Sequence, residues 1–338
     1  MYQDKAFLMN FSAGFLLLSS VGIAHAQSAE PTLIRQTVVT AVTNLPALLA
    51  PNYASQFGLK IEIVPARTPQ EAVTAVLRGD VDLFTGVPTQ VIQARDVGLP
   101  LVIISGSVRA STQLLLKKTL NIKPDDWAAL RALVSSSKAS GAKLRFGTPV
   151  AGSTNYATCY ASLLKNGIDP KVDLDIVPMQ DFPSHGSALG KGDISMLCTS
   201  EPFATIASQN GTGSFFVNPY DSELGDQLGS INTSEKVLQD PRKREALQRY
   251  VRLFDFVVQK IKADPAVARN DIMKRFGMTA AAADRTLEHT YWDMRLDVKE
   301  IAALAKFTYA PLGQTKKDWS CCVKDYVDTS FTTFLTKR

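Results

Sequence analysis

An internal repeat is the feature that most constrains the fold of this chain. Ile61–Pro65 aligns with Leu174–Pro178, and at the same offset of 113 residues Arg78–Val81 aligns with Lys191–Ile194. Each copy reads as an alternating strand, a small helix that ends at Gly-Asp, an apolar strand, a proline and a further helix. Strands that alternate with helices are typical of parallel α/β sheets. The repeat therefore predicts two similar α/β lobes in one chain.

A strand, a polar turn and a helix precede each copy of the repeat. In the first half the strand is Thr37–Val42, and in the second half it is Leu144–Pro149, with a helix expected over Tyr156–Leu164. In open sheets of this kind, ligands bind beyond the carboxyl ends of the strands. We therefore expect function in the turns that follow the strands, which contain Thr43, Asn44, Thr85, Gly86, Ser153, Thr154, Asn155, Ser200 and Glu201.

The chain after about residue 240 has helical spacing. Apolar residues recur from Tyr250 to Ile261 with Lys and Arg between them, and short amphipathic helices are expected over 269–276, 280–291 and 298–307. Asp240-Pro241 and Asp264-Pro265 favour helix starts, because Asp accepts from free N–H groups and Pro suits the first turn. We expect this tail to fold back over lobe one.

Residues 1–26 have the pattern of a secretory signal peptide. Lys5 precedes an apolar stretch, and Ala24-His25-Ala26 is a small-x-small cleavage pattern. An uncleaved anchor is the alternative, but polar residues break the stretch and it is shorter than the ~20 residues of a membrane span. The sequence predicts cleavage before Gln27 and an exported, soluble protein.

Composition excludes several functions. The 37 Lys and Arg and the 32 Asp and Glu residues are spread along the chain without a basic block, so no nucleic-acid partner is expected. The chain has three histidines and lacks CxxC and HExxH motifs, so we expect no metal and no cofactor. With 45% apolar residues, it has enough material for a core in each of about two domains.

The four cysteines form two groups, Cys159 with Cys198 and Cys321 with Cys322. Export to an oxidising compartment allows thiols to pair. We favour two buried thiols and an unbridged vicinal pair, with a Cys159–Cys198 disulfide as the alternative. Neither arrangement predicts a nucleophile.

The turn at 152–155 opens a helix, whose free N–H groups and positive dipole end suit an anion. An ordinary N-cap is the alternative, but the matching turn at Thr43-Asn44 favours two sites that clamp one small polar ligand. Glu201 follows an apolar strand, so it either caps the next helix or accepts from a ligand.

Histidines and aromatic residues give weaker signals. His185 and His289 lack a neighbouring pattern of carboxylate and serine, so we expect packing roles and no catalytic triad. Aromatic side chains are more often core than pocket wall. Of the candidates for a pocket wall, we select Tyr156 and Phe182, leaving Trp127, Tyr160, Tyr220 and Trp292.

Three stretches carry a family resemblance: EAVTAVLRGDVDLFTG, GTPVAGSTNYATCYASLLKNGIDP and ALGKGDISMLCTSEPF. With the signal peptide, they resemble the periplasmic substrate-binding proteins of ABC importers in the nitrate/sulfonate/taurine group, which are related to thiamine-pyrimidine-precursor binders. The resemblance covers most of the mature chain, although the C-terminal helices match only in pattern. It implies a type II periplasmic binding protein fold with two parallel-rich α/β lobes, two crossing strands and C-terminal helices on lobe one. The expected boundaries are 27–117 and 227–338 for lobe one and 118–226 for lobe two.

The resemblance also implies a function. A monomeric periplasmic receptor would bind a small polar, anionic or zwitterionic organic solute, such as a sulfonate or taurine, between its lobes. It would deliver this solute to an inner-membrane ABC permease complex. By position, the implied ligand contacts are Thr43, Asn44, Thr85, Gly86, Ser111, Thr112, Ser153, Thr154, Asn155, Tyr156, Phe182 and Glu201. Ser200-Glu201 departs from the Asp and aromatic residue of sulfonate binders and would suit an amino-sulfonate or a pyrimidine.

Rival functions are an enzyme on the same scaffold, similar to a thiamine pyrimidine synthase, a binder of a pyrimidine or aromatic carboxylate, and an extracellular sensor. The signal peptide and the isolated Cys321-Cys322 pair argue against the enzyme. A binding protein needs no catalytic group, so the receptor is favoured.

Overall fold

The structure is a computed structural model. It describes residues 30–66, 68–150, 152–220, 224–226 and 229–337. The expected signal peptide and its cleavage point before Gln27 lie outside the described residues. The chain from Pro31 onward forms one compact unit.

The first sheet has five strands in the order β2-β1-β3-β10-β4. β1 pairs in parallel with β2 and β3, whereas β10 runs antiparallel between β3 and β4. The strand bounds are β1 Thr32–Val38, β2 Leu59–Pro65, β3 Leu83–Gly86, β4 Leu101–Gly106 and β10 Ser230–Ser234.

The second sheet repeats this arrangement in the order β7-β6-β8-β5-β9. β6 is parallel to β7 and β8, and β5 runs antiparallel between β8 and β9. The strand bounds are β5 Thr112–Lys117, β6 Leu144–Thr148, β7 Leu174–Pro178, β8 Met196–Ser200 and β9 Gly213–Val217. β2 corresponds to β7 and β3 to β8, which are the strands that the internal repeat aligned. The predicted two-lobed α/β fold is confirmed.

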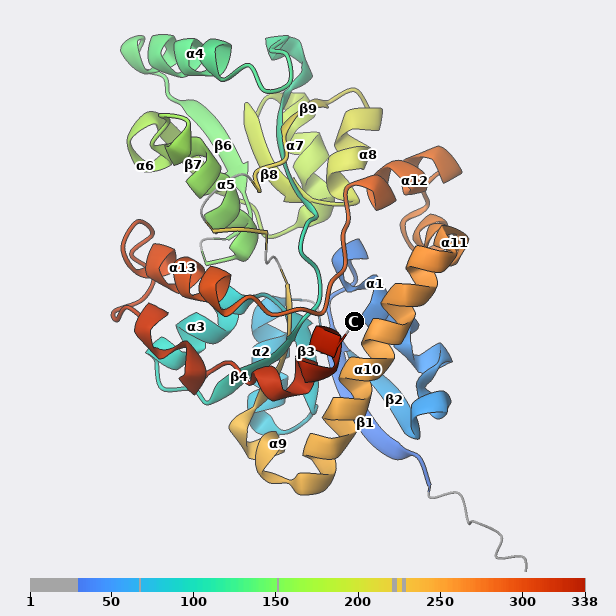
Figure 1. The fold of residues 1–338 in the computed structure, drawn as a ribbon. Helices are drawn as coiled ribbons and strands as arrows, with labels where there is room; N and C mark the ends of the chain where they lie inside the picture. The colour runs from blue at the N-terminus through green and yellow to red at the C-terminus, as the bar shows by residue number, and fades with distance from the viewer. Residues whose placement is uncertain (1–29, 67, 151, 221–223, 227–228, 338) are drawn as a thin grey trace, which may run out of the picture. The chain divides into compact units, whose positions relative to one another are not determined.

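Helices flank both sheets (Figure 1). Before the second sheet lie α1 Leu45–Leu49, α2 Pro69–Arg78 and α3 Pro88–Asp96, and with the second sheet come α4 Trp127–Ala139, α5 Thr154–Lys165, α6 Pro170–Asp173, α7 His185–Lys191 and α8 Phe203–Gln209. The tail contains α9 Glu235–Gln239, α10 Pro241–Ala263, α11 Pro265–Phe276, α12 Ala280–Glu288 and α13 Val298–Tyr309. The short 3-10 segments are η1 Val42–Asn44, η2 Ala50–Asn52, η3 Ala54–Phe57, η4 Lys118–Leu120, η5 Phe182–Ser184, η6 Ser320–Asp325 and η7 Thr329–Lys337.

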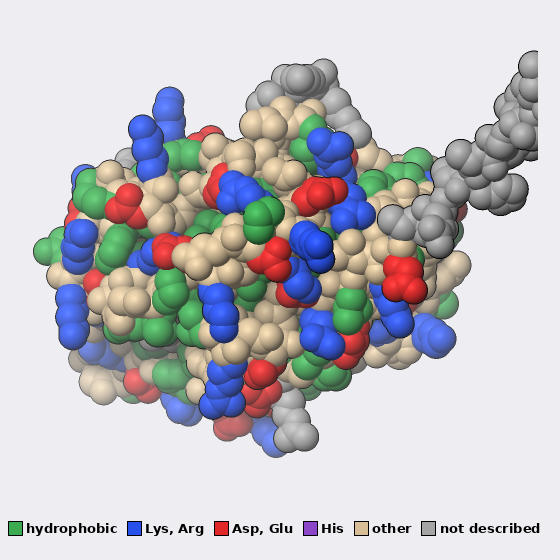
Figure 2. Space-filling model, turned by 90° about the horizontal axis from the view of Figure 1, so that it is seen from below, with side chains coloured by type: hydrophobic (Ala, Val, Ile, Leu, Met, Phe, Trp, Pro, Cys, Tyr) green, Lys and Arg blue, Asp and Glu red, His purple; other side chains and the backbone are tan. Residues whose placement is uncertain are grey.

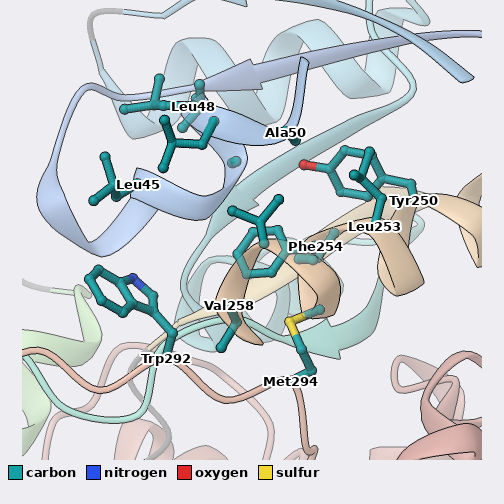
Figure 3. Packing of buried hydrophobic residues seen from close by; sticks show 14 of the residues in the cluster. Leu45, Leu48, Ala50, Tyr250, Leu253, Phe254, Val258, Trp292 and Met294 are labelled. Atoms are coloured by element: carbon teal, nitrogen blue, oxygen red, sulfur yellow. The ribbon is translucent and has the colours of Figure 1, made fainter. Parts of the chain in front are cut away.

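The tail helices begin where the sequence predicts. The Asp240 side chain accepts from two amides at the start of α10, and Asp264 accepts from the Ala266 amide at the start of α11. α10 then packs on α1 and the first sheet, and its Tyr250 ring lies beside Ala50, just after α1 (Figure 3). The return of the tail to lobe one is therefore confirmed. α12 departs from this pattern, because it contacts α8 beside the second sheet.

Three segments run between the sheets. The first, 107–111, joins β4 to β5, and the second joins β9 to β10 and is described at 218–220, 224–226 and 229. The tail segment 289–297 lies beside the first, where the Tyr291 amide donates to the Ala110 carbonyl at 2.9 Å. The expected boundary at residue 118 lies just after β5, whereas strand pairing places β5 in the second sheet.

Both cysteine pairs differ from the favoured expectation of free thiols. Cys159 on α5 and Cys198 on β8 form a disulfide, and Cys321 is bonded to Cys322. Cys159 and Cys198 are 39 residues apart in sequence, but α5 packs on β8 and brings their Cα atoms to 6.3 Å. Disulfides span Cα separations of about 4.4–6.8 Å. Sequence spacing alone did not reveal this proximity.

Charges of both signs are interspersed on the face shown in Figure 2. Among the described residues, no helix combines the length and the apolar character that a bilayer crossing requires.

Candidate functional site

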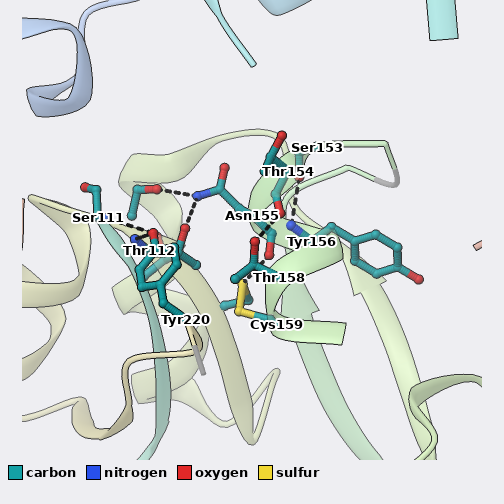
Figure 4. Close-up of a disulfide and its surroundings, with 12 residues drawn as sticks. Ser111, Thr112, Ser153, Thr154, Asn155, Tyr156, Thr158, Cys159 and Tyr220 are labelled. Atoms are coloured by element: carbon teal, nitrogen blue, oxygen red, sulfur yellow. Dashed lines mark hydrogen bonds between the residues drawn. A yellow bond between two sulfur atoms is a disulfide. The ribbon is translucent and has the colours of Figure 1, made fainter. Parts of the chain in front are cut away.

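Buried polar side chains meet where β5 begins and where β6 and β8 end. Asn155, near the start of α5, donates from Nδ2 to Thr112 Oγ1 at 2.7 Å and to Ser200 Oγ at 2.5 Å (Figure 4). The antiparallel pairing of β5 with β8 sets Thr112 opposite Ser200, so one amide reaches both oxygens. All three residues are buried. Because the amide supplies both hydrogens, the Ser200 hydroxyl keeps its own hydrogen to donate.

Tyr220 joins this group from the second crossing segment. Its hydroxyl oxygen accepts from the Ser111 amide at 2.8 Å and from the Thr112 amide at 2.6 Å. Burial raises the pKa of Tyr220 to about 12, so the phenol stays neutral at physiological pH. The sequence offered Tyr220 only as one of several aromatic residues, and nothing local to it indicated these two amides.

The first turns of α3 and α5 face each other across the two sheets. Thr89 Oγ1 on α3 lies 3.2 Å from Thr154 Oγ1 on α5, and both residues are buried. Gln93 Nε2 donates to the Gly152 carbonyl at 3.3 Å. Gly152 has φ +100°, a backbone conformation that favours glycine, and an added Cβ would lie 2.5 Å from Gln93 Nε2, so the amide of Gln93 would have to move. One face of α3 therefore lies against the start of α5, whose free N–H groups and positive dipole end belong to this region. The sequence analysis missed Thr89, which carries no motif of its own.

Two hydroxyl groups beside this region are buried and unpaired. Ser111 precedes β5, and its carbonyl accepts from the Glu201 amide at 3.0 Å, while Thr148 is the last residue of β6. Among the described residues, neither Ser111 Oγ nor Thr148 Oγ1 has a hydrogen-bond partner. A buried hydroxyl without a partner costs about 1–3 kcal/mol. A bound polar molecule would remove this cost.

Glu201 is fully buried and has partners within the protein. Its Oε1 lies 2.6 Å from His289 Nδ1, and its Oε2 accepts from the Thr205 amide at 3.0 Å. The sequence around His289 gives no sign of this partner, because the end of α12 lies against α8 and brings together residues 88 positions apart. His185 takes the expected packing position, with Nδ1 2.9 Å from Thr199 Oγ1.

Other residues expected at the site have local roles. Ser153 Oγ caps α5 by accepting from the Tyr156 amide at 3.1 Å. The Thr43 carbonyl accepts from Trp292 Nε1 at 3.0 Å, and Asn44 Nδ2 donates to a carbonyl within its own loop. Thr85 and Gly86 end β3 and pair with β10.

The two selected aromatic residues are packing residues here. Tyr156 belongs to an apolar cluster with α2 and α3, and its ring points away from Asn155 (Figure 4). Phe182 packs on the rings of His185 and Phe203. Between described residues, no hydrogen bond links Thr43, Asn44, Tyr156 or Phe182 to the Asn155 side chain.

Known proteins share this architecture. The model of the NMT1-like family matches residues 28–249. The alkanesulfonate-binding protein SsuA from Xanthomonas axonopodis pv. citri, solved with MOPS, is 17% identical with a TM-score of 0.72, covering 89% of this chain and 100% of its own. The nitrate-binding protein NrtA from Synechocystis PCC 6803 is 12% identical with a TM-score of 0.73, covering 91% and 89%. SsuA from Escherichia coli is 14% identical with a TM-score of 0.69, covering 85% and 95%. These likenesses show the fold. No curated protein matches the chain.

Proposed function

The chain belongs to the NMT1-like family, and from this premise we propose that it is a periplasmic solute-binding protein of an ABC importer. It holds one small polar solute between its two sheets and delivers it, as a monomer, to a membrane permease. We assign β5 to lobe two, so that the lobes meet at the crossing segments 107–111 and 218–229.

The facing first turns of α3 and α5 carry this proposal. They come from different sheets, and Thr89 and Thr154 bring a hydroxyl from each to 3.2 Å. The unpaired hydroxyls of Ser111 and Thr148 lie at the start of β5 and the end of β6, the two strands that flank β8. A solute rich in acceptor oxygens would satisfy these donors and draw the two sheets together.

We propose an organic sulfonate, anionic or zwitterionic, as the solute class. The side chains that form the site are uncharged, and their hydroxyl groups are the donors that remain for a solute, namely Thr89, Ser111, Thr112, Thr148, Thr154, Ser200 and Tyr220 around the Asn155 amide. Helix N-termini and neutral donors can hold an anion without a cationic side chain. Structural neighbours that bind alkanesulfonate and nitrate support an oxyanion.

The test is binding to the mature chain from Gln27, freed of co-purified solute by unfolding and refolding. Calorimetry and thermal shift would be measured with taurine, MOPS, nitrate, aromatic carboxylates and thiamine-type pyrimidines. A ligand at a hundredfold excess over its Kd stabilises the folded state by about 2.7 kcal/mol. Conversion of a bound compound to product would instead favour an enzyme.

Asn155→Ala tests the site itself. Loss of the amide that organises Thr112 and Ser200 should weaken binding about 10-fold to 100-fold. Ser162→Ala is the matched control, because it removes a buried hydroxyl from the same helix away from the first turn. Equal affinity of Asn155→Ala and wild type would show that the solute binds elsewhere.

A further inference from the structure

The Cys159–Cys198 disulfide joins the two elements that present the polar site. Asn155 lies four residues before Cys159 on α5, and Ser200 lies two residues after Cys198 on β8. Residues four apart share a face of a helix, and residues two apart share a face of a strand. The disulfide and the Asn155–Ser200 hydrogen bond therefore connect the same two faces, about one helical turn apart.

Close packing surrounds this covalent link. Both cysteines are fully buried, in an apolar cluster with Phe146 and Leu163. Cys198 Sγ lies 3.3 Å from the carbonyl oxygen of Asn155, so the sulfur touches the backbone of the residue that organises the site. Figure 4 shows Cys159 directly beneath the first turn of α5.

We propose that the Cys159–Cys198 disulfide is a positioning element for solute binding. It holds the first turn of α5 against the end of β8, so that the Asn155 amide reaches Thr112 and Ser200 together. The inference rests on the proposed function and extends it, because solute affinity then depends on the oxidation state of these two residues. The reduced dithiol protein keeps its fold but binds the solute more weakly.

The first test compares two double variants by calorimetry with taurine and MOPS, at a low temperature where circular dichroism shows both to be folded. Cys159→Ala/Cys198→Ala should bind about tenfold more weakly than wild type, a loss of about 1.4 kcal/mol. Cys321→Ser/Cys322→Ser is the control, because it removes the other bonded pair, and it should bind as wild type does. Equal affinity of both variants overturns the proposal.

A double-mutant cycle separates positioning from general stability. Asn155→Ala should cost much affinity when the disulfide is present and little when it is absent, because the amide is then already misplaced. The same cost in both backgrounds shows that the disulfide only stabilises the fold, which overturns the proposal. No cost in either background contradicts the proposed solute site instead.

Two further measurements keep the test decisive. Hydrogen exchange of the peptide over 153–158 needs no ligand: it should be faster in Cys159→Ala/Cys198→Ala and unchanged in the control, and unchanged exchange in both overturns the proposal. If the double variant does not fold, wild type is titrated with dithiothreitol, whose dithiol becomes a cyclic disulfide as the protein disulfide takes up two electrons and two protons. If the oxidised protein binds the solute about tenfold more tightly, bound solute makes the Cys159–Cys198 disulfide equally harder to reduce. Saturating taurine or MOPS should therefore raise about tenfold the ratio of reduced to oxidised dithiothreitol at which half of this disulfide is reduced. An unchanged ratio overturns the proposal.

Discussion

At the scale of single residues, the site depends on which hydrogens are already in use. The Asn155 amide donates both of its hydrogens, one to Thr112 and one to Ser200. The Tyr220 hydroxyl oxygen accepts hydrogen bonds from two backbone amides. What remains for a solute is the set of hydroxyl groups around them. Both ring nitrogens of His185 likewise have partners within the protein, because they lie against Thr199 Oγ1 and the Met179 carbonyl. A carbonyl can only accept, so Nε2 carries the hydrogen.

The buried His185 predicts a pH dependence of stability. Burial lowers the pKa of this imidazole below its ordinary 6.5. As the pH falls below about 7, His185 becomes protonated in the unfolded chain but stays neutral in the folded protein. The free energy of unfolding therefore falls by up to about 1.4 kcal/mol per pH unit until the pH reaches the folded-state pKa. Urea unfolding between about pH 5 and pH 7 should show this slope in wild type and a smaller one in His185→Gln. The same slope in both proteins would contradict the buried neutral histidine.

At the scale of elements, helix starts and the alternation of strands with helices were predictable and contacts between elements were not. Asp240 and Asp264 cap α10 and α11, as their Asp-Pro pairs predicted. Such starts can be predicted because capping depends on residues adjacent in sequence. The disulfide between α5 and β8 depends on how a helix lies on a sheet, which local pattern does not encode. Spacing could only leave that pairing open.

The disulfide should contribute strongly to stability. It closes a loop of 39 residues, for which the loss of chain entropy in the unfolded state predicts about 4 kcal/mol. Urea unfolding of Cys159→Ala/Cys198→Ala should show a loss of at least this size, because the variant also leaves a cavity in the core. The Cys321–Cys322 bond closes almost no loop, so the free energy of unfolding of Cys321→Ser/Cys322→Ser should fall far less. Equal losses in the two variants would contradict the loop argument.

At the scale of the whole molecule, Arg109 ties the segments between the sheets together. It lies in the first crossing, donates from Nη2 to both carboxylate oxygens of Glu300 on α13 at 2.8 and 2.7 Å, and also pairs with Asp226 in the second crossing. Burial lowers the pKa of Arg109, but the two carboxylates raise it by more. The internal repeat, with one copy in each lobe, does not predict this contact between the crossing segments. Arg109, Asp226 and Glu300 come from separate parts of the chain.

Arg109→Met should therefore destabilise the protein. The Arg109 side chain is only 12% exposed, whereas its partners Asp226 and Glu300 are 37% and 21% exposed, so leaving these two carboxylates unpaired costs about 1–3 kcal/mol. Arg145→Met is the control, since Arg145 and Asp175 are 49% and 60% exposed and such pairs contribute about 0–1 kcal/mol. Urea unfolding measures both variants, and a similar small loss in each would show that the junction does not depend on Arg109.

The sequence by itself determined the two α/β lobes and the helical tail, because hydrophobic periodicity and caps depend on residues close together in sequence and the internal repeat is visible by aligning the chain with itself. It also predicted a role for the α5 turn and for the Ser200 region, which remains a prediction. Only the tertiary structure decided three contacts between distant residues. They are the hydrogen bond between the Thr89 and Thr154 hydroxyls, the Cys159–Cys198 disulfide, and the contact of His289 with the Glu201 carboxylate. These contacts depend on sheet register and on how distant helices pack, and those follow from burial summed over the whole chain.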